Sequence, residues 1–178
     1  VGICGFYFLV RLGGMIKIYH NPECGTSRNV LAVIKAAGYE VQVIEYLRVG
    51  WEREQLTYLL NAANLNPRQA LRTTKSPAAE LGLLDETVSN EIIFELMLEH
   101  PVLVNRPIVC IPEGEHEKEV SLPLGRVEGN SYSNNAKETV KLCRPSEAIL
   151  DILPVWPQGP FAKEDGTPLI DQDGKRVI

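Results

Sequence analysis

The feature that most constrains the fold of this chain is a change of hydrophobic period near its start. Residues 16–19 form a short β-prone run, which Asn21-Pro22 stops. From Thr26 the apolar residues recur at helical spacing, and Gly38 is suited to end that helix. Residues 41–46 then indicate a second strand. A strand–loop–helix–strand unit of this kind is typical of an α/β fold.

The middle of the chain continues with helices and then strands. The apolar pattern predicts that residues 51–100 are helical throughout, with Ser89 as the N-cap of the last helix. Residues 102–104 and 108–111 are predicted to be two further strands. A final helix is expected at 146–153. These elements favour one α/β domain, which is also what 178 residues lead us to expect.

Three segments lie outside the regular pattern. Residues 1–14 are apolar but too short to span a membrane, and we interpret them as an upstream extension to a domain at 15–155. Residues 112–141 are acidic, rich in turn formers and without a period, so we predict a surface insertion. The tail, 156–178, contains two Asp-Gly pairs, which indicate a hairpin.

Charge and cysteine content narrow the class of protein. A net charge of -5 argues against nucleic acid or an acidic membrane as the partner, because both need a basic surface. An anion site would therefore require locally clustered arginine or lysine. The four cysteines are widely scattered, which favours free thiols and a cytoplasmic location. No cysteine pair with metal-ligand spacing lies near His100 or His116, so we expect no zinc site.

The segment His20–Asn29 carries the chemistry, because it places Cys24 in a turn immediately before a helix. The first backbone N–H groups of a helix lack internal partners, and the helix dipole adds partial positive charge there. Both effects favour a thiolate and can also bind an oxyanion. Thr26 and Ser27 offer hydroxyl groups to the sulfur, and Arg28 adds charge. The alternative interpretation of Cys24 is a buried structural cysteine.

The residues after Cys24 exclude two known kinds of cysteine loop. A dithiol oxidoreductase needs Cys-x-x-Cys, but the second cysteine position is Ser27. A cysteine phosphatase loop needs an arginine six residues after the nucleophile, and Val30 stands there. The sequence therefore predicts a loop with a single reactive thiol.

Three motifs in order resemble those of the glutaredoxin-linked arsenate reductases, which have a thioredoxin-like fold. The first is His20–Asn29, and the others are Val104–Val109 and Leu142–Glu147. The likeness runs from Met15 to about Ile111, resumes at about Lys141 and continues into the tail. The resemblance implies a thioredoxin-like mixed sheet with flanking helices and an inserted helical subdomain at about 51–100.

The resemblance also implies a reaction. Cys24 is similar to the nucleophile that attacks arsenate and forms a sulfur–arsenic adduct. Three arginines match residues that hold the oxyanion: Arg72, Arg106 and Arg144. In the family, glutathione and then glutaredoxin complete the reduction and release arsenite, without a bound cofactor. Arginine forks suit tetrahedral oxyanions and would reduce the repulsion between a thiolate and an anionic substrate.

Other positions take supporting roles by the same resemblance. His20 and Ser27 match residues that support the ionised cysteine, although His20 could equally be an ordinary core histidine. Pro107 matches the proline that follows a cis peptide bond in thioredoxin-like folds, so we predict that Arg106–Pro107 is cis. Cys143 is interpreted as structural, because the resolving thiol is expected to come from glutathione.

The sequence leaves some alternatives open. The insertion at 112–141 precedes Arg144 and could shift that arginine away from the site. A rival function is that of a thioredoxin-fold regulator that binds RNA polymerase. Such regulators commonly carry Cys-x-x-Cys, which Ser27 interrupts. A nearer rival is a related thiol oxidoreductase with another substrate.

Overall fold

The computed structural model describes residues 14–113 and 137–177. The predicted upstream extension therefore lies almost entirely outside the described residues, and so does the segment 114–136 of the predicted insertion.

The centre of the fold is a mixed sheet of four strands in the order β2-β1-β3-β4. Strands β1 and β2 are parallel, and β3 is antiparallel to both of its neighbours. The bounds are β1 Ile16–Tyr19, β2 Val41–Ile44, β3 Ile108–Pro112 and β4 Glu138–Leu142. The predicted strand–helix–strand unit is present as β1, α1 and β2, so the α/β prediction is confirmed.

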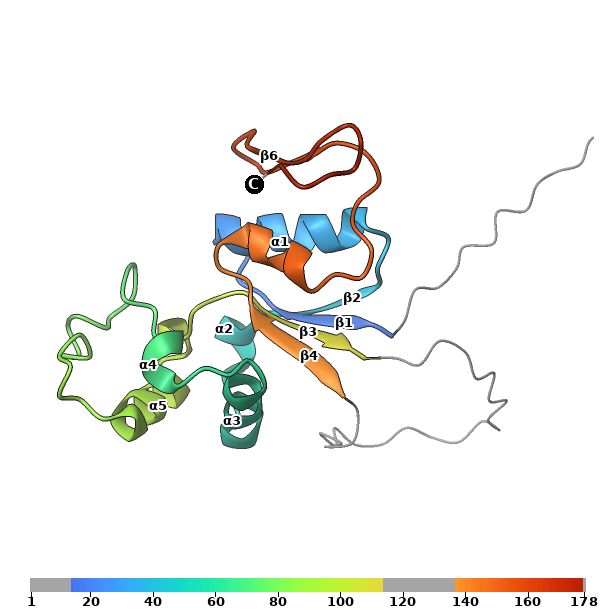
Figure 1. Ribbon diagram of the computed structural model, residues 1–178. Helices are drawn as coiled ribbons and strands as arrows, with labels where there is room; N and C mark the ends of the chain where they lie inside the picture. The colour runs from blue at the N-terminus through green and yellow to red at the C-terminus, as the bar shows by residue number, and fades with distance from the viewer. Residues whose placement is uncertain (1–13, 114–136, 178) are drawn as a thin grey trace, which may run out of the picture.

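Helices cover both faces of this sheet (Figure 1). On one face lie α1 Gly25–Ala36 and the 3-10 helix η2 Ser146–Asp151. On the other face lie α2 Tyr46–Val49 and α3 Arg53–Ala62. Helices α4 Pro67–Ala70 and α5 Asn90–Glu99 form a group to one side, followed by the 3-10 helix η1 Pro101–Leu103. The C-terminal hairpin, β5 Phe161–Ala162 and β6 Pro168–Ile170, lies over α1.

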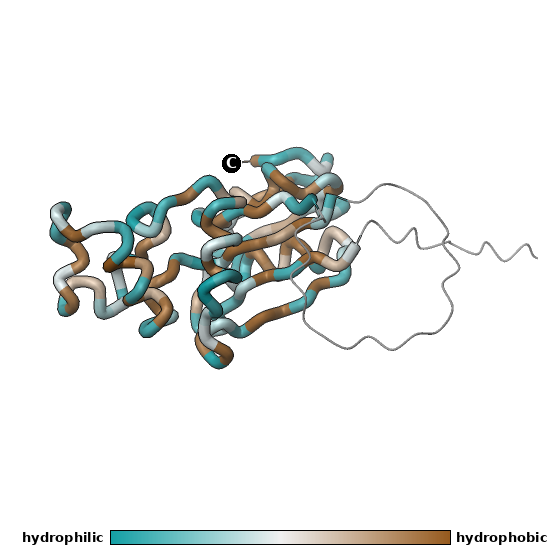
Figure 2. The backbone as a smooth tube through the Cα atoms, turned by 90° about the horizontal axis from the view of Figure 1, so that it is seen from below, coloured by the Kyte–Doolittle hydropathy of each residue, from teal (hydrophilic) through white to brown (hydrophobic). Residues whose placement is uncertain are grey.

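The sheet separates two buried clusters because successive strand side chains point to opposite faces. In β3, Ile108 and Cys110 join the cluster formed with Tyr46 and the leucines of α3. Val109 and Ile111 join the other cluster, which contains the apolar face of α1. Figure 2 shows the hydrophobic stretches along the strands at the centre of the molecule. The spacing in the sequence predicts one apolar face of the first helix from Val30, Val33, Ile34 and Ala37. The first three are buried, and Ala37 is the C-cap residue and is half-buried.

Two predictions for the middle of the chain were wrong. Residues 71–89 are mostly turns rather than helix, so the helical segment 51–100 is interrupted. Residues 102–104 are not a strand: Pro101 opens a 3-10 turn, and only Val104 makes a β-bridge, to Leu71. Proline fixes φ near the helical value, which explains the turn.

Two boundaries also differ from the predictions. The predicted insertion at 112–141 includes a strand, β4, whose Glu138 pairs with Pro112 at the end of β3. Its polar residues hid the pattern, since Val140 alone among the residues of β4 is buried. The helix predicted at 146–153 is the shorter η2, and the predicted second strand ends at Ile44, before α2. The hairpin predicted in the tail is confirmed by the β5–β6 pair.

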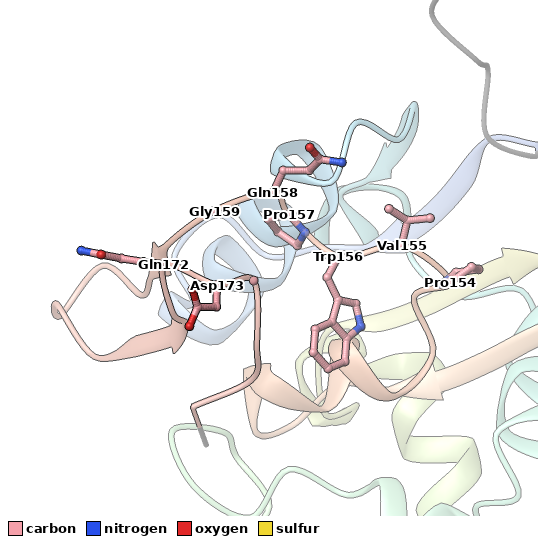
Figure 3. Close-up of a pocket in the computed structure, with 9 residues that line it drawn as sticks. Pro154, Val155, Trp156, Pro157, Gln158, Gly159, Gln172 and Asp173 are labelled. Atoms are coloured by element: carbon pink, nitrogen blue, oxygen red, sulfur yellow. The ribbon is translucent and has the colours of Figure 1, made fainter.

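One hollow among the described residues lies in the tail (Figure 3). It is lined by residues 154–159 and 172–174, and none of these is a predicted site residue. Within the part of the chain that the structure describes, no helix is long and apolar enough to cross a membrane. The same part contains no cluster of three or more histidine, cysteine or acidic side chains arranged to hold a metal ion.

Candidate active site

Cys24 is the N-cap residue of α1, at the end of the loop that follows β1. Its backbone N–H donates to the carbonyl of Asn21 at 3.0 Å, and its own carbonyl accepts from the N–H of Arg28 at 3.0 Å. The loop is thus a closed turn joined to the first turn of the helix. The Cys24 side chain is partly exposed, so a reactant can reach the sulfur.

Buried polar side chains hold this loop in shape. Ser27 is fully buried, and its Oγ accepts from the backbone N–H of Asn21 at 3.5 Å. The Asn21 Oδ1 in turn accepts from the N–H of Glu23 at 2.9 Å. The side chains of Asn21 and Ser27 therefore fix the turn on both sides of Cys24. The Cys24 sulfur faces the unpaired N–H groups at the start of α1.

This environment makes Cys24 acidic. Burial alone would raise the pKa of its thiol, but the backbone N–H of Ser27, the Arg106 guanidinium, the Ser27 hydroxyl and the backbone N–H of Thr26 lower the pKa to about 7. Burial instead raises the pKa of Cys110 and of Cys143 to about 12. The three cysteines among the described residues are free thiols, and of these three only Cys24 is substantially ionised near neutral pH.

Two predicted arginines are brought together by a short antiparallel contact. Leu71 forms a β-bridge with Val104, the Arg72 N–H donates to the Leu103 carbonyl at 2.8 Å, and the Asn105 N–H donates to the Ala70 carbonyl at 2.8 Å. Arg72 and Arg106 follow directly on these two segments. Both are buried charged residues, 7% and 5% exposed. The charge of Arg106 acts on Cys24, and the charges of Cys24 and Arg106 act on Arg72. The structure therefore places two guanidinium groups beside Cys24.

Each of the two guanidinium groups has one buried N–H donor without a hydrogen-bond partner. Arg72 Nε donates to the carbonyl of Thr74 at 2.7 Å, but its Nη1 is buried without a partner, and so is Arg106 Nε. A buried donor left without a partner costs about 1–3 kcal/mol, and more when the group is charged. Burial and the neighbouring charges of Arg106 and Arg144 lower the pKa of Arg72. An anion bound here would satisfy both donors and screen the like charges from each other.

Arg144 reaches the same site from the end of β4. The Cys143 N–H donates to the carbonyl of Pro107 at 2.9 Å, which joins the two segments, and the charge of Arg144 acts on Arg72. The insertion leaves the sheet at the Pro112–Glu138 pair, at the opposite end of these strands from the Ile108–Leu142 pair. Arg144 therefore follows the end of the strand pair that is opposite to the insertion, and it is exposed to solvent.

The remaining predicted residues also lie in this region. His20 is buried, and burial lowers the pKa of its imidazole, so it is neutral near neutral pH and adds no positive charge to Cys24. Its Nδ1 has no hydrogen-bond partner. The Arg106–Pro107 peptide bond is cis. The Arg144–Pro145 bond is cis as well, which the sequence did not lead us to expect.

Tyr46 is a site residue that sequence reasoning missed. Its hydroxyl accepts from Arg106 Nη1 at 3.4 Å and lies 3.5 Å from the Val104 carbonyl, while its ring stacks on Trp51 at 4.7 Å. The sequence predicts Tyr46 at the end of the second strand, but Tyr46 starts α2, and its hydroxyl contacts Arg106. An aromatic residue just after a strand was the only available signal.

Arg28 lies near Cys24, as its position suggested, and its charge interacts with that of the thiolate. Its guanidinium is also paired with Glu164. Among the main effects that lower the pKa of Cys24, the positive charge is that of Arg106.

Comparison with known proteins agrees with this geometry. The ArsC family model matches residues 19–152. The chain is 56% identical over 163 residues to "Arsenate reductase ArsI2" of Synechocystis, covering 92% of this chain and 99% of that protein. It is 38% identical over 162 residues to an arsenate reductase of Escherichia coli K12, covering 91% and 97%.

Solved structures give the same result. An arsenate reductase from Vibrio cholerae superposes with a TM-score of 0.61 at 31% identity, covering 80% of this chain and 100% of that one. A putative arsenate reductase from Yersinia pestis superposes with a TM-score of 0.57 at 28% identity, covering 77% and 99%. The predicted resemblance is thus confirmed: the chain belongs to the ArsC family and has its thioredoxin-like fold.

Proposed function

We propose that this protein reduces arsenate to arsenite, with Cys24 as the nucleophile and with glutathione and glutaredoxin as the reductants. One observation carries the proposal: a thiol with a pKa of about 7 lies beside two buried guanidinium groups that have unused donors. A structural cysteine needs neither feature. The names of the relatives, which are arsenate reductases, point to the same substrate.

The arginines would bind the oxyanion and Cys24 would attack it. Arg72, Arg106 and Arg144 present positive charge from three separate segments, which suits a tetrahedral anion. Hydrogen bonds from charged donors contribute about 1.5–3 kcal/mol each, and here two donors have no competing partner. The same charges reduce the repulsion between thiolate and arsenate as they approach.

The supporting residues act on the thiolate or on the arginines. Ser27 would stabilise the ionised sulfur through its N–H and its hydroxyl, as its effect on the pKa indicates. His20 would support the loop as a neutral side chain. Pro107 would shape the segment that carries Arg106 next to the cysteine.

The reaction balances with two external thiols. The Cys24 sulfur forms a bond to arsenic as an arsenic–oxygen bond breaks, and the oxygen leaves as water after protonation. Glutathione then displaces a second oxygen from arsenic, which also leaves as water, so that arsenic is bonded to both sulfurs. A glutaredoxin thiol attacks the glutathione sulfur: a mixed disulfide forms, the arsenic–glutathione bond breaks, and its electron pair stays on arsenic and reduces As(V) to As(III). Water then hydrolyses the remaining bond between arsenic and Cys24, arsenite departs, and Cys24 returns as a thiolate. External reductants fit this site because Cys110 and Cys143 are buried and protonated. Their supply implies a reducing, cytoplasmic setting.

The test is arsenite production by the purified protein with arsenate, glutathione and glutaredoxin. We expect turnover with both reductants, a large loss when glutaredoxin is left out, and none for Cys24→Ser. Cys110→Ser is the matched control, since it removes a thiol that remains protonated near neutral pH. Wild-type protein that produces no arsenite, or a Cys24→Ser variant that retains turnover, would refute the proposal.

A further inference from the structure

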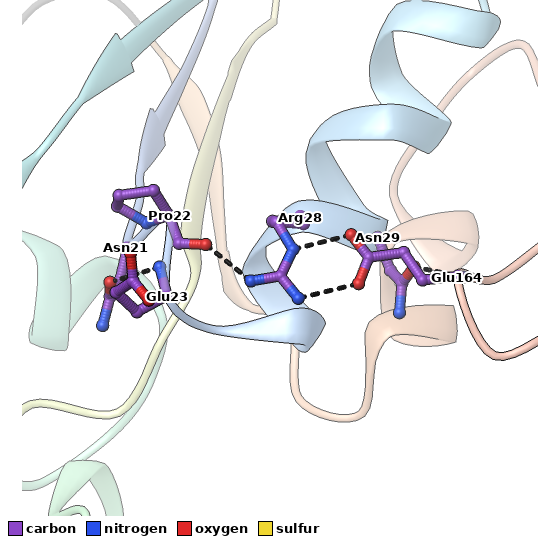
Figure 4. A network of polar contacts seen from close by, with 6 residues as sticks. All are labelled: Asn21, Pro22, Glu23, Arg28, Asn29 and Glu164. Atoms are coloured by element: carbon purple, nitrogen blue, oxygen red, sulfur yellow. Dashed lines mark hydrogen bonds and ion pairs between the residues drawn. The ribbon is translucent and has the colours of Figure 1, made fainter.

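The C-terminal hairpin contacts the loop that carries Cys24. Between β5 and β6, Glu164 forms a two-point ion pair with Arg28, with Nε–Oε1 at 2.7 Å and Nη2–Oε2 at 2.9 Å. The Glu164 backbone N–H also donates to Asn29 Oδ1 at 2.9 Å (Figure 4). Residues some 135 positions apart in the chain are thus joined by three hydrogen bonds at the first turns of α1.

Arg28 extends this contact across the cysteine loop. Its Nη1 donates to the carbonyl of Pro22 at 2.6 Å, two residues before Cys24 (Figure 4). The guanidinium therefore joins both sides of the turn, and the Glu164 carboxylate fixes its orientation. Arg28 thus has a geometric function in this arrangement, in addition to its charge.

The residue before Glu164 contacts a second part of the site. Lys163 Nζ lies 3.0 Å from Glu147 Oε2, and both side chains are well shielded, at 15% and 17% exposure. Glu147 is three residues after Arg144 and belongs to η2. A tight turn holds Lys163, whose N–H donates to the Thr167 carbonyl at 2.8 Å and whose carbonyl accepts from the Gly166 N–H at 2.9 Å.

We propose that Lys163 and Glu164 form a clamp that positions the Cys24 loop relative to the Arg144 segment. Glu164 holds the loop through Arg28, Lys163 holds the other segment through Glu147, and the turn keeps the two side chains at a fixed spacing. Both are positioning residues, since neither contacts the sulfur. This inference rests on the proposed function, because the spacing matters for an anion held between the thiolate and Arg144.

The test compares Glu164→Ala and Lys163→Ala with Arg176→Ala as the matched control. Arg176 also ties the tail to η2, with Nη1 2.6 Å from Asp151 Oδ1, but this pair does not touch the cysteine loop. We expect kcat/KM for arsenate to fall about threefold to fivefold in each clamp variant, mainly through KM, and to change less than twofold in the control. Because the clamp needs both contacts, the double variant should be little worse than either single one.

A second measurement needs no arsenate. Hydrogen–deuterium exchange of the peptide that covers residues 21–31 should be faster in Glu164→Ala than in the wild type, and unchanged in Arg176→Ala. If the wild type reduces no arsenate, the proposed function fails while this exchange still tests the clamp. Unchanged exchange in Glu164→Ala would overturn the inference. So would a loss of kcat/KM in the clamp variants no larger than in Arg176→Ala, or additive losses of kcat/KM in the double variant.

Discussion

Replacing Ser27 by alanine removes a single hydroxyl group from the environment of the Cys24 thiolate. The hydroxyl and the backbone N–H of Ser27 both lower the pKa of Cys24, and the substitution removes only the hydroxyl. Ser27 is fully buried in the first turn of α1, where alanine is an excellent helix former, so the helix should persist.

The size of the effect follows from the strength of a hydrogen bond to a charged acceptor, about 1.5–3 kcal/mol. Because Cys24 is partly exposed, water can replace some of that interaction, and the lower end of the range applies. This is roughly one pKa unit, from about 7 to roughly 8. Near pH 7 the ionised fraction then falls from about half to roughly a tenth, and the rate of any thiolate reaction falls about fivefold.

The assay is a titration of the thiolate by its ultraviolet absorbance, in protein whose Cys4 has been replaced by serine. Thr26→Ala is the matched control: it also removes a hydroxyl from the first turn of α1, but Thr26 acts on the pKa of Cys24 through its backbone N–H. A Ser27→Ala midpoint within about 0.3 units of the wild type, or an equal shift in Thr26→Ala, would refute this reasoning.

Further predictions concern the arginine side of the site. Arg106→Gln should raise KM for arsenate at least tenfold and also raise the pKa of Cys24, because a positive charge that favours the thiolate is lost; kinetics and thiol titration measure the two effects. Tyr46→Phe should keep the stacking on Trp51 but lose the contact with Arg106, so KM should rise about twofold to tenfold at nearly unchanged melting temperature. Arsenate at about 100 times its Kd should stabilise the wild type by about 2.7 kcal/mol, a rise of roughly 5–10 °C in melting temperature, and Arg72→Ala should lose most of that rise.

The sequence predicted the secondary structure and the position of the reactive cysteine where residues close together in the chain determine them. The period change near the start predicted β1, α1 and β2, and the position of Cys24 before a helix could be read from the residues around it. The three arginines came from the resemblance. Local patterns could not place Arg72 beside Arg106, since that depends on the bridge between Leu71 and Val104, two segments distant in the chain.

The features that the sequence did not predict share one physical reason: each of them depends on a contact with a residue or strand elsewhere in the chain. Strand β4 has mixed polarity and forms by pairing with β3. Tyr46 could have continued a strand, and its packing on Trp51 is what places it at the start of α2. The pairing of Arg28 with Glu164 could not be predicted, because Glu164 lies in the tail, far from Arg28 in the chain.

The central claim is that Cys24 is a thiolate at neutral pH, and the pH dependence of its alkylation by iodoacetamide tests that claim most directly. Mass spectrometry would locate the label, while Cys110 and Cys143 should remain unmodified because burial raises the pKa of each to about 12. We expect the alkylation rate of Cys24 to rise with pH, to be half-maximal at about pH 7 and to level off above it. A midpoint near 9, the ordinary pKa of the thiol, would contradict the account.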